Sequence, residues 1–198
     1  MRRINSLSDL LMEELADLLN AENQSLEFLP KLADASQLPA LRRVLEDHLV
    51  LSKEHIRRLE NIFNNIAQRP QGVICETVRK IISESDEVIH QREKGISRDA
   101  AIVSIVSRVE LYEIDEYQTA CEHAVILGHT QIVEILNKTL DEERIMNSYL
   151  NELAQFMINV QAIDPTGSQK FVRKGSRNKP KNNEVSRFID EGNPNIQY

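Results

Sequence analysis

The fold is indicated most directly by residues 102–140, which read IVSIVSRVELYEIDEYQTACEHAVILGHTQIVEILNKTL. Apolar residues recur there every three or four positions on both sides of Gly128, which is the period of an α-helix. Glycine commonly ends a helix, and Thr130 is suited to cap the next one. We therefore predict two long antiparallel helices, one from residue 97 or 99 to residue 127 and one from residue 130 to about residue 160.

The first part of the chain repeats this pattern. Residues 6–34 and 39–68 carry apolar stripes of helical period, with Ser6 or Ser8 as a cap and Pro30 as the site of a kink or a tightened last turn. Residues 73–93 form a shorter pattern, which we interpret as a crossover helix. Two long hairpins joined by a crossover predict an all-α protein, an up-down four-helix bundle with ferritin-like connectivity.

Length and composition agree with one bundle. The chain has 198 residues, and only three of its six glycines precede residue 165, which favours helices over sheets with many turns. Cys75 and Cys121 belong to no metal-binding motif, so we expect both to be buried and reduced. No apolar run is long enough to span a membrane and no signal peptide is recognisable, so we expect a cytoplasmic protein without a membrane partner.

The composition changes near residue 165. Residues 165–198 contain seven Lys and Arg against three Asp and Glu, whereas residues 1–164 contain 17 basic against 28 acidic residues. We expect a bundle domain at 1–164 and a basic, disordered tail at 165–198 that is solubilising or binds a protein partner. The acidic body argues against nucleic-acid binding.

Polar residues interrupt the apolar stripes of all four long helices. These residues are Glu22 in the first helix, His48 and His55 in the second, Glu113 with Glu110 beside it in the third, and Glu143 in the fourth. Glu113 and Glu143 each lie fifteen residues from Gly128, so they should lie at one level of the bundle. Glu22 lies fourteen residues before the first turn, which places it near His48. Buried carboxylates and imidazoles at one level are typical of di-iron and di-manganese bundles.

A metal pair is not the only interpretation of these residues. Such centres usually contain two Glu-x-x-His motifs, whereas here no histidine follows Glu143 at that spacing and position 51 is leucine. The glutamates could instead form a structural network with Arg58, Arg108, Tyr112 or Tyr117, and His48 and His55 could be core histidines bonded to carboxylates.

Several short motifs resemble one bacterial family. They are Ala21-Glu22-Asn23-Gln24, Leu29-Pro30-Lys31-Leu32-Ala33, Asp47-His48-Leu49, Arg58-Leu59-Glu60, Arg108-Val109-Glu110-Leu111-Tyr112-Glu113-Ile114, Leu127-Gly128-His129 and Thr139-Leu140-Asp141-Glu142-Glu143. Over about residues 6–162 the chain is similar to the YciE/YciF family of ferritin-like proteins. The resemblance implies a ferritin-like bundle, dimerisation and a role in stress, with no established reaction.

The resemblance also implies roles for individual residues. Metal-ligand roles map onto Glu22, Glu110, Glu113 and Glu143, with His48 nearby. The family tends to have glutamate, histidine and aspartate where this chain has Leu51, Leu111 and Asn147, respectively. Each difference replaces a candidate ligand or outer partner with a poorer one.

Two functional hypotheses follow. In the first, a stress-associated ferritin-like protein binds iron or manganese between its helices, with Tyr112 or Tyr117 beside the metal and, if the metal is redox-active, a weak oxidase or peroxide-consuming activity. In the second, no metal is bound and the bundle is a homodimeric scaffold without enzymatic activity. The inward glutamates favour the first hypothesis, and Leu51, Leu111 and Asn147 favour the second.

Overall fold

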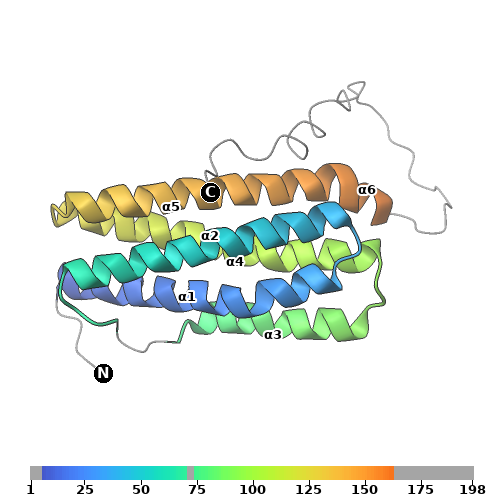
Figure 1. Cartoon of the computed structure of the whole chain (residues 1–198), viewed down its shortest axis with the longest axis horizontal. Coiled ribbons are helices and arrows are strands. Elements are labelled where there is room, and N and C mark those ends of the chain that lie inside the picture. The colour runs from blue at the N-terminus through green and yellow to red at the C-terminus, as the bar shows by residue number, and fades with distance from the viewer. Residues whose placement is uncertain (1–5, 71–73, 163–198) are drawn as a thin grey trace, which may run out of the picture. The chain divides into compact units, whose positions relative to one another are not determined.

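A computed structural model describes residues 6–70 and 74–162, without the side chains of residues 159 and 160. The described helices are α1 (Leu7–Ala35), α2 (Pro39–Asn65), α3 (Glu76–Gln91), α4 (Ile96–Ile126), α5 (Thr130–Leu153) and α6 (Asn159–Ala162), with a π-helical turn at Ala154–Ile158 before α6 (Figure 1). This confirms the all-α prediction. The predicted disordered tail at 165–198 lies outside the described residues.

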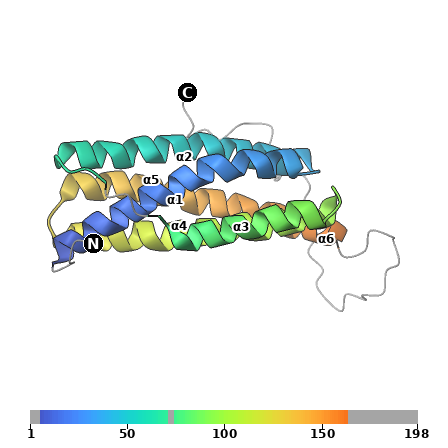
Figure 2. The ribbon, with the colours of Figure 1, turned by 90° about the horizontal axis from the view of Figure 1, so that it is seen from below.

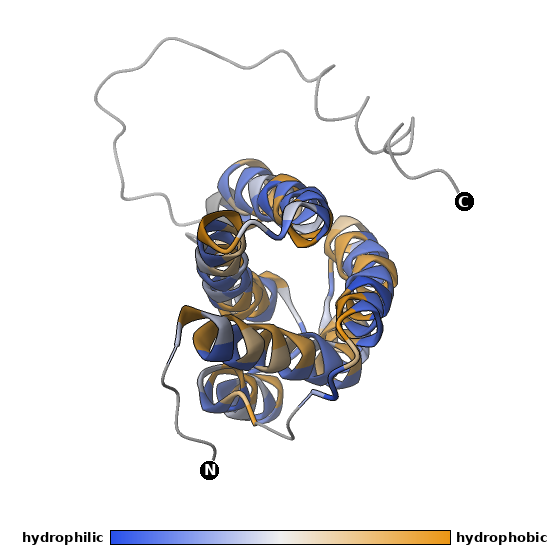
Figure 3. Cartoon of the chain, turned by 90° about the vertical axis from the view of Figure 1, so that its left-hand side faces the viewer, coloured by the Kyte–Doolittle hydropathy of each residue, from blue (hydrophilic) through white to orange (hydrophobic). Residues whose placement is uncertain are grey.

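The four long helices form a closed ring. The hairpin partners α1 and α2 pack together, as do α4 and α5, and the ring closes through contacts of α1 with α4 and of α2 with α5 (Figure 2). Seen along the bundle, these helices surround a common axis and α3 lies outside them, against α1 and α4 (Figure 3). This arrangement confirms the bundle of two hairpins with a crossover helix.

The directions of the four long helices explain why a crossover helix is needed. Contacts between α1 and α4 pair Glu14 with His123 and Ser25 with Glu113, so these neighbouring helices are antiparallel. The helices α2 and α4 therefore run in the same direction, and the chain must return along the bundle before α4 begins. A helix of 16 residues such as α3 spans about 24 Å of that return.

The helix ends agree with the predicted caps in part. Ser6 accepts a hydrogen bond from the Asp9 amide, and Gly128 ends α4 with a φ of 73°. Thr130 is the first residue of α5 and not its cap, because His129 occupies the cap position and no side chain caps it. Pro30 lies inside the continuous helix α1, near its end, where the prediction placed a kink or a tightened turn.

The core consists of two apolar clusters that occupy opposite parts of the bundle. One includes Phe28, Leu41, Val106 and Leu150, and the other includes Leu15, Leu59, Ala120 and Leu136. The residue numbers show that a layer near residues 22, 52, 113 and 143 lies between them. The predicted polar residues belong to this layer, which apolar side chains flank on both sides.

Cys75 and Cys121 are both free and buried, as expected from the sequence. None of the helices in the described parts of the chain combines the length and the apolar character needed to cross a membrane.

Asp99 holds the loop between α1 and α2. The sequence pattern identified this residue only as a possible first residue of a helix. Its fully buried carboxylate accepts hydrogen bonds from the amides of Gln37 (2.7 Å) and Leu38 (2.8 Å). Asp99 thus joins the beginning of α4 to the loop of the first hairpin.

Replacing this carboxylate should destabilise the fold. Asp99→Ala should lower the free energy of unfolding by about 2–4 kcal/mol, because two buried amides lose a charged acceptor. Urea unfolding measures the change, and Asp34→Ala, which removes an exposed carboxylate from the end of α1, is the matched control. Equal stability of the two variants would contradict the role of Asp99.

Candidate metal centre

All six side chains predicted as metal ligands lie inside the bundle. They come from the four long helices: Glu22 from α1, His48 and His55 from α2, Glu110 and Glu113 from α4, and Glu143 from α5. The four carboxylates have no exposed surface, and the two histidines are each 1% exposed. The apolar stripes of the sequence therefore identified their inward orientation.

Their donor atoms form two groups of three. The His55 subsite consists of Glu22, His55 and Glu143, and the His48 subsite consists of His48, Glu113 and Glu143; within each, the donor atoms lie within 4.8 Å of one another. Glu143 belongs to both subsites, so its carboxylate would serve both if each held a cation. Glu110 adjoins the second, with its Oε1 2.8 Å from Nδ1 of His48.

The His55 subsite is surrounded by oriented partners. Nδ1 of His55 lies 3.0 Å from Oε1 of Glu22 and 2.9 Å from Oε1 of Glu143. The buried Tyr117 hydroxyl donates a hydrogen bond of 2.8 Å to the same Glu22 oxygen, and its ring packs edge-on against the His55 ring. The positions of Glu22 and His55 are thus fixed by contacts from α1, α2, α4 and α5.

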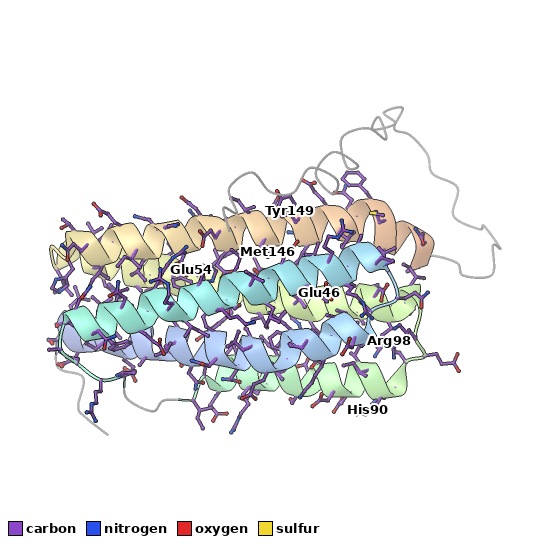
Figure 4. All side chains as sticks on the ribbon, in the orientation of Figure 1. Glu46, Glu54, His90, Arg98, Met146 and Tyr149 are labelled. Carbon is purple, nitrogen blue, oxygen red and sulfur yellow. The ribbon has the colours of Figure 1, made fainter. Side chains whose placement is uncertain are left out.

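The far side of His55 contacts Glu142, which the sequence did not identify as part of the site. Nε2 of His55 lies 3.0 Å from Oε2 of Glu142. Arg58 binds this carboxylate with both terminal nitrogens, at 2.5 and 3.0 Å, and also donates to Thr139 at 3.1 Å. Glu54, labelled on α2 in Figure 4, lies 3.3 Å from Nε of Arg58.

The His48 subsite has fewer such partners. Within the described residues, neither ring nitrogen of His48 makes a hydrogen bond, although Nδ1 is close to Glu110, and the Ser52 hydroxyl also has no hydrogen-bond partner. Glu113 accepts one long hydrogen bond, 3.3 Å, from Ser25. The ligands of this subsite are therefore less constrained than those around His55.

The mutual repulsion and burial of the carboxylates shift their pKa values. Burial raises the pKa of Glu110 and of Glu143 to about 8. Burial also raises the pKa of Glu113 well above its ordinary value, with added repulsion from Glu22 and Glu143. Glu110 and Glu143 therefore retain most of their protons at neutral pH in the metal-free chain.

The pKa values of the two histidines and of Glu142 shift in different directions. Burial lowers the pKa of His48, whereas for His55 the effect of burial is outweighed by Glu22 and Glu143, so that its pKa rises well above the ordinary value. Burial would raise the pKa of Glu142, but hydrogen bonds from His55 and Arg58 lower it to about 2. Glu142 is consequently a stable anion beside a cationic or hydrogen-donating imidazole.

The residues present fit a pair of divalent cations. Six buried carboxylate oxygens of the centre make no hydrogen bond within the described chain: Oε2 of Glu22, both oxygens of Glu110, Oε2 of Glu113 and both oxygens of Glu143. Two of them, Oε1 of Glu110 and Oε1 of Glu143, instead face imidazole nitrogens at 2.8 and 2.9 Å. Four carboxylates and two imidazoles are also the donors that dinuclear bundles use. Here the helix α2 supplies both imidazoles and α4 supplies a Glu-x-x-Glu pair, so none of the six candidate ligands belongs to a Glu-x-x-His motif.

The three departures from the family pattern have different consequences. Leu51 packs against an apolar cluster, so position 51 offers no ligand where the family tends to have a glutamate. Leu111 is 56% exposed, so its substitution removes nothing from the interior. Oδ1 of Asn147 is buried without a hydrogen-bond partner. Of the three positions, Leu111 therefore lies at the surface, whereas the partly buried Leu51 and the Oδ1 atom of Asn147 lie inside the bundle.

Some expected neighbours lie elsewhere. Tyr112 donates its hydroxyl hydrogen bond to Asp17, and Arg108 pairs with Glu84 on α3, so neither contacts the six candidate ligands through these bonds. Tyr117 and Arg58 do belong to the site. Ser25 and Ser52 were missed, although both follow an identified residue by three or four positions on an apolar stripe.

Comparisons with known proteins agree with this architecture. Residues 6–163 match a family model described as a domain of unknown function, DUF892. The protein YciF of Escherichia coli strain K12 is 30% identical over 160 residues, which cover 80% of this chain and 96% of YciF.

Solved structures give the same result. The crystal structure of the E. coli stress protein YciF aligns with a TM-score of 0.74 at 30% identity, over 76% of this chain and 96% of that one. YcfI from Rhodopseudomonas palustris, provisionally described as a structural protein, aligns with a TM-score of 0.73 at 37% identity, over the same shares. The chain therefore belongs to the DUF892 family and is a relative of the E. coli stress protein YciF.

Proposed function

We propose that this chain is a stress-associated ferritin-like protein that binds two divalent metal ions, iron or manganese, between its four long helices. The observation that carries the proposal is the set of four fully buried carboxylates, each with at least one oxygen that makes no hydrogen bond within the described residues, in a layer flanked by apolar clusters. Buried carboxylates without hydrogen bonds are costly, and cations neutralise them. Carboxylate and imidazole donors are suited to both metals.

Each ligand has a role that follows from its position. Glu143 bridges the two subsites, Glu22 and His55 complete one, and His48, Glu113 and Glu110 complete the other. Tyr117 orients Glu22 through its hydroxyl. Bound iron would supply one-electron exchange with dioxygen or peroxide.

The wider biological role is part of the same proposal. A function in stress is supported by the relationship to YciF, which is described as a stress protein. The cytoplasmic location and the homodimer expected from the sequence also belong here, as does a protein partner for the tail. Catalytic turnover is not required, because a centre that only binds metal has the same ligands.

A metal-free scaffold is the second candidate. Leu51 supports it because this position contributes packing instead of a ligand. The provisional description of the R. palustris relative as a structural protein also favours it. In this case the buried carboxyls retain their protons, and the homodimer is the functional unit.

Metal content distinguishes the two candidates. The full chain, purified without a tag or chelator and incubated anaerobically with ferrous iron or with Mn²⁺, should contain about two metal ions per chain by elemental mass spectrometry. A folded chain that contains no metal after both treatments would support the scaffold and contradict the metal proposal.

Glu143 is the residue whose loss should matter most. Glu143→Gln should reduce bound metal to below about one tenth of the wild-type content, because one carboxylate serves both subsites. Glu152→Gln removes an exposed charge from the same helix and should retain full metal content. Circular dichroism verifies that both variants are folded, and unchanged metal in Glu143→Gln would refute the bridging role.

The metal-free chain should become less stable as the pH rises from about 7 to about 9. Glu110 and Glu143, with pKa values of about 8 in the folded chain, begin this range with protons that the unfolded chain has already released, and they lose these protons as the pH passes 8. His48 does not oppose this trend, because the range lies above its ordinary pKa of 6.5. Calorimetric melting in the presence of a chelator measures the effect.

Two additions make this pH experiment specific. Glu110→Gln should show a weaker fall in Tm, because an amide does not titrate. Mn²⁺ should raise the Tm at the higher pH, since a ligand of the folded state stabilises it. A Tm of the metal-free wild type that stays constant or increases over the range would contradict the buried protons.

A further inference from the structure

The two subsites differ in how firmly the chain holds their ligands. In the His55 subsite, Glu22 and His55 are each fixed by partners outside the ligand set, Tyr117 and Glu142. In the His48 subsite, Nδ1 of His48 lies 2.8 Å from Glu110, itself a candidate ligand, and no described residue outside the candidate ligands forms a hydrogen bond with the imidazole. Ligands that are already oriented lose less freedom when a cation binds.

Glu142 is the outermost of the residues that hold the candidate ligands of the His55 subsite. Its side chain is 24% exposed, and it does not belong to either group of candidate ligands. Its Oε2 atom faces Nε2 of His55, while Nδ1 of the same ring faces Glu22 and Glu143. The ring is thus oriented with Nδ1 toward the ligand set and Nε2 toward a carboxylate.

Arg58 keeps this carboxylate in place. Its two terminal nitrogens bind both oxygens of Glu142, and it is anchored by Thr139 and Glu54. A two-point arginine–carboxylate pair has a defined geometry as well as a defined charge. Carboxylates that accept the free N–H of a metal-bound histidine select its tautomer and ring orientation.

We propose that Glu142, held by Arg58, is a positioning residue that presents His55 through Nδ1 and makes the His55 subsite the first of the two to take up a divalent cation. This inference rests on the proposed metal function and adds an order of filling to it. The His48 subsite fills second, because no described residue outside the candidate ligands forms a hydrogen bond with the imidazole of His48, and Glu113 accepts only the long hydrogen bond from Ser25.

Calorimetric titration of the metal-free full chain with Co²⁺ tests this order. The wild type should bind two ions in separate steps. Glu142→Ala should weaken the first step by about 10–100-fold, the usual effect of losing an outer partner of a ligand, and should bring the two steps together. Glu142→Gln, whose amide oxygen still accepts from Nε2, should show a smaller loss.

Two controls separate positioning from charge. Glu134→Gln removes an exposed carboxylate from α5 and should leave both steps unchanged. The double variant Arg58→Gln/Glu142→Ala restores the net charge, so its first step should remain weak if Glu142 positions His55 and should recover if only charge matters. Circular dichroism and melting confirm that each variant is folded.

The outcomes distinguish this inference from the one on which it rests. A wild-type chain that binds no Co²⁺ overturns both. A wild type with two steps and a Glu142→Ala variant whose first step changes by less than about twofold overturns only the role of Glu142. A single unresolved step in the wild type, or recovery in the double variant, likewise overturns the positioning role and leaves the metal centre intact.

Discussion

The structure depends on how four fully buried carboxylates are neutralised. Glu22, Glu110, Glu113 and Glu143 have no exposed surface, and an unpaired charge in a protein interior is among the most costly groups to bury. The described residues compensate only in part, with the hydroxyls of Tyr117 and Ser25 and the imidazoles of His48 and His55. Retained protons or bound cations must supply the rest, and two divalent cations would match four negative charges.

The bundle supports this polar layer from all sides. Apolar clusters lie at both of its ends, and each of the four long helices contributes a ligand candidate. Asp99 fixes the first hairpin to α4 at one end of the bundle, while Arg58 and Glu142 connect α2 to α5 beside the centre. Fold and site are therefore linked, because the contacts that set the helix register also set the ligand positions.

Much of this could be predicted from the sequence. Helical period identified the long helices, and counting residues from Gly128 placed Glu113 and Glu143 at one level, where both contribute to the His48 subsite. Periodicity describes only one helix at a time, so it did not reveal the contacts that a residue makes with another helix or with a loop. Glu142 and Asp99 were missed for this reason, and Leu111 was given a place near the centre although it is exposed.

The most direct test is anomalous diffraction from crystals of the full chain grown with Mn²⁺. The account predicts two manganese peaks within the helical bundle, one beside Glu22 and His55 and one beside His48 and Glu113, with Glu143 in contact with both. Ordered carboxylates with no anomalous peak between the four helices would contradict it, and would identify the buried glutamates as a protonated structural network.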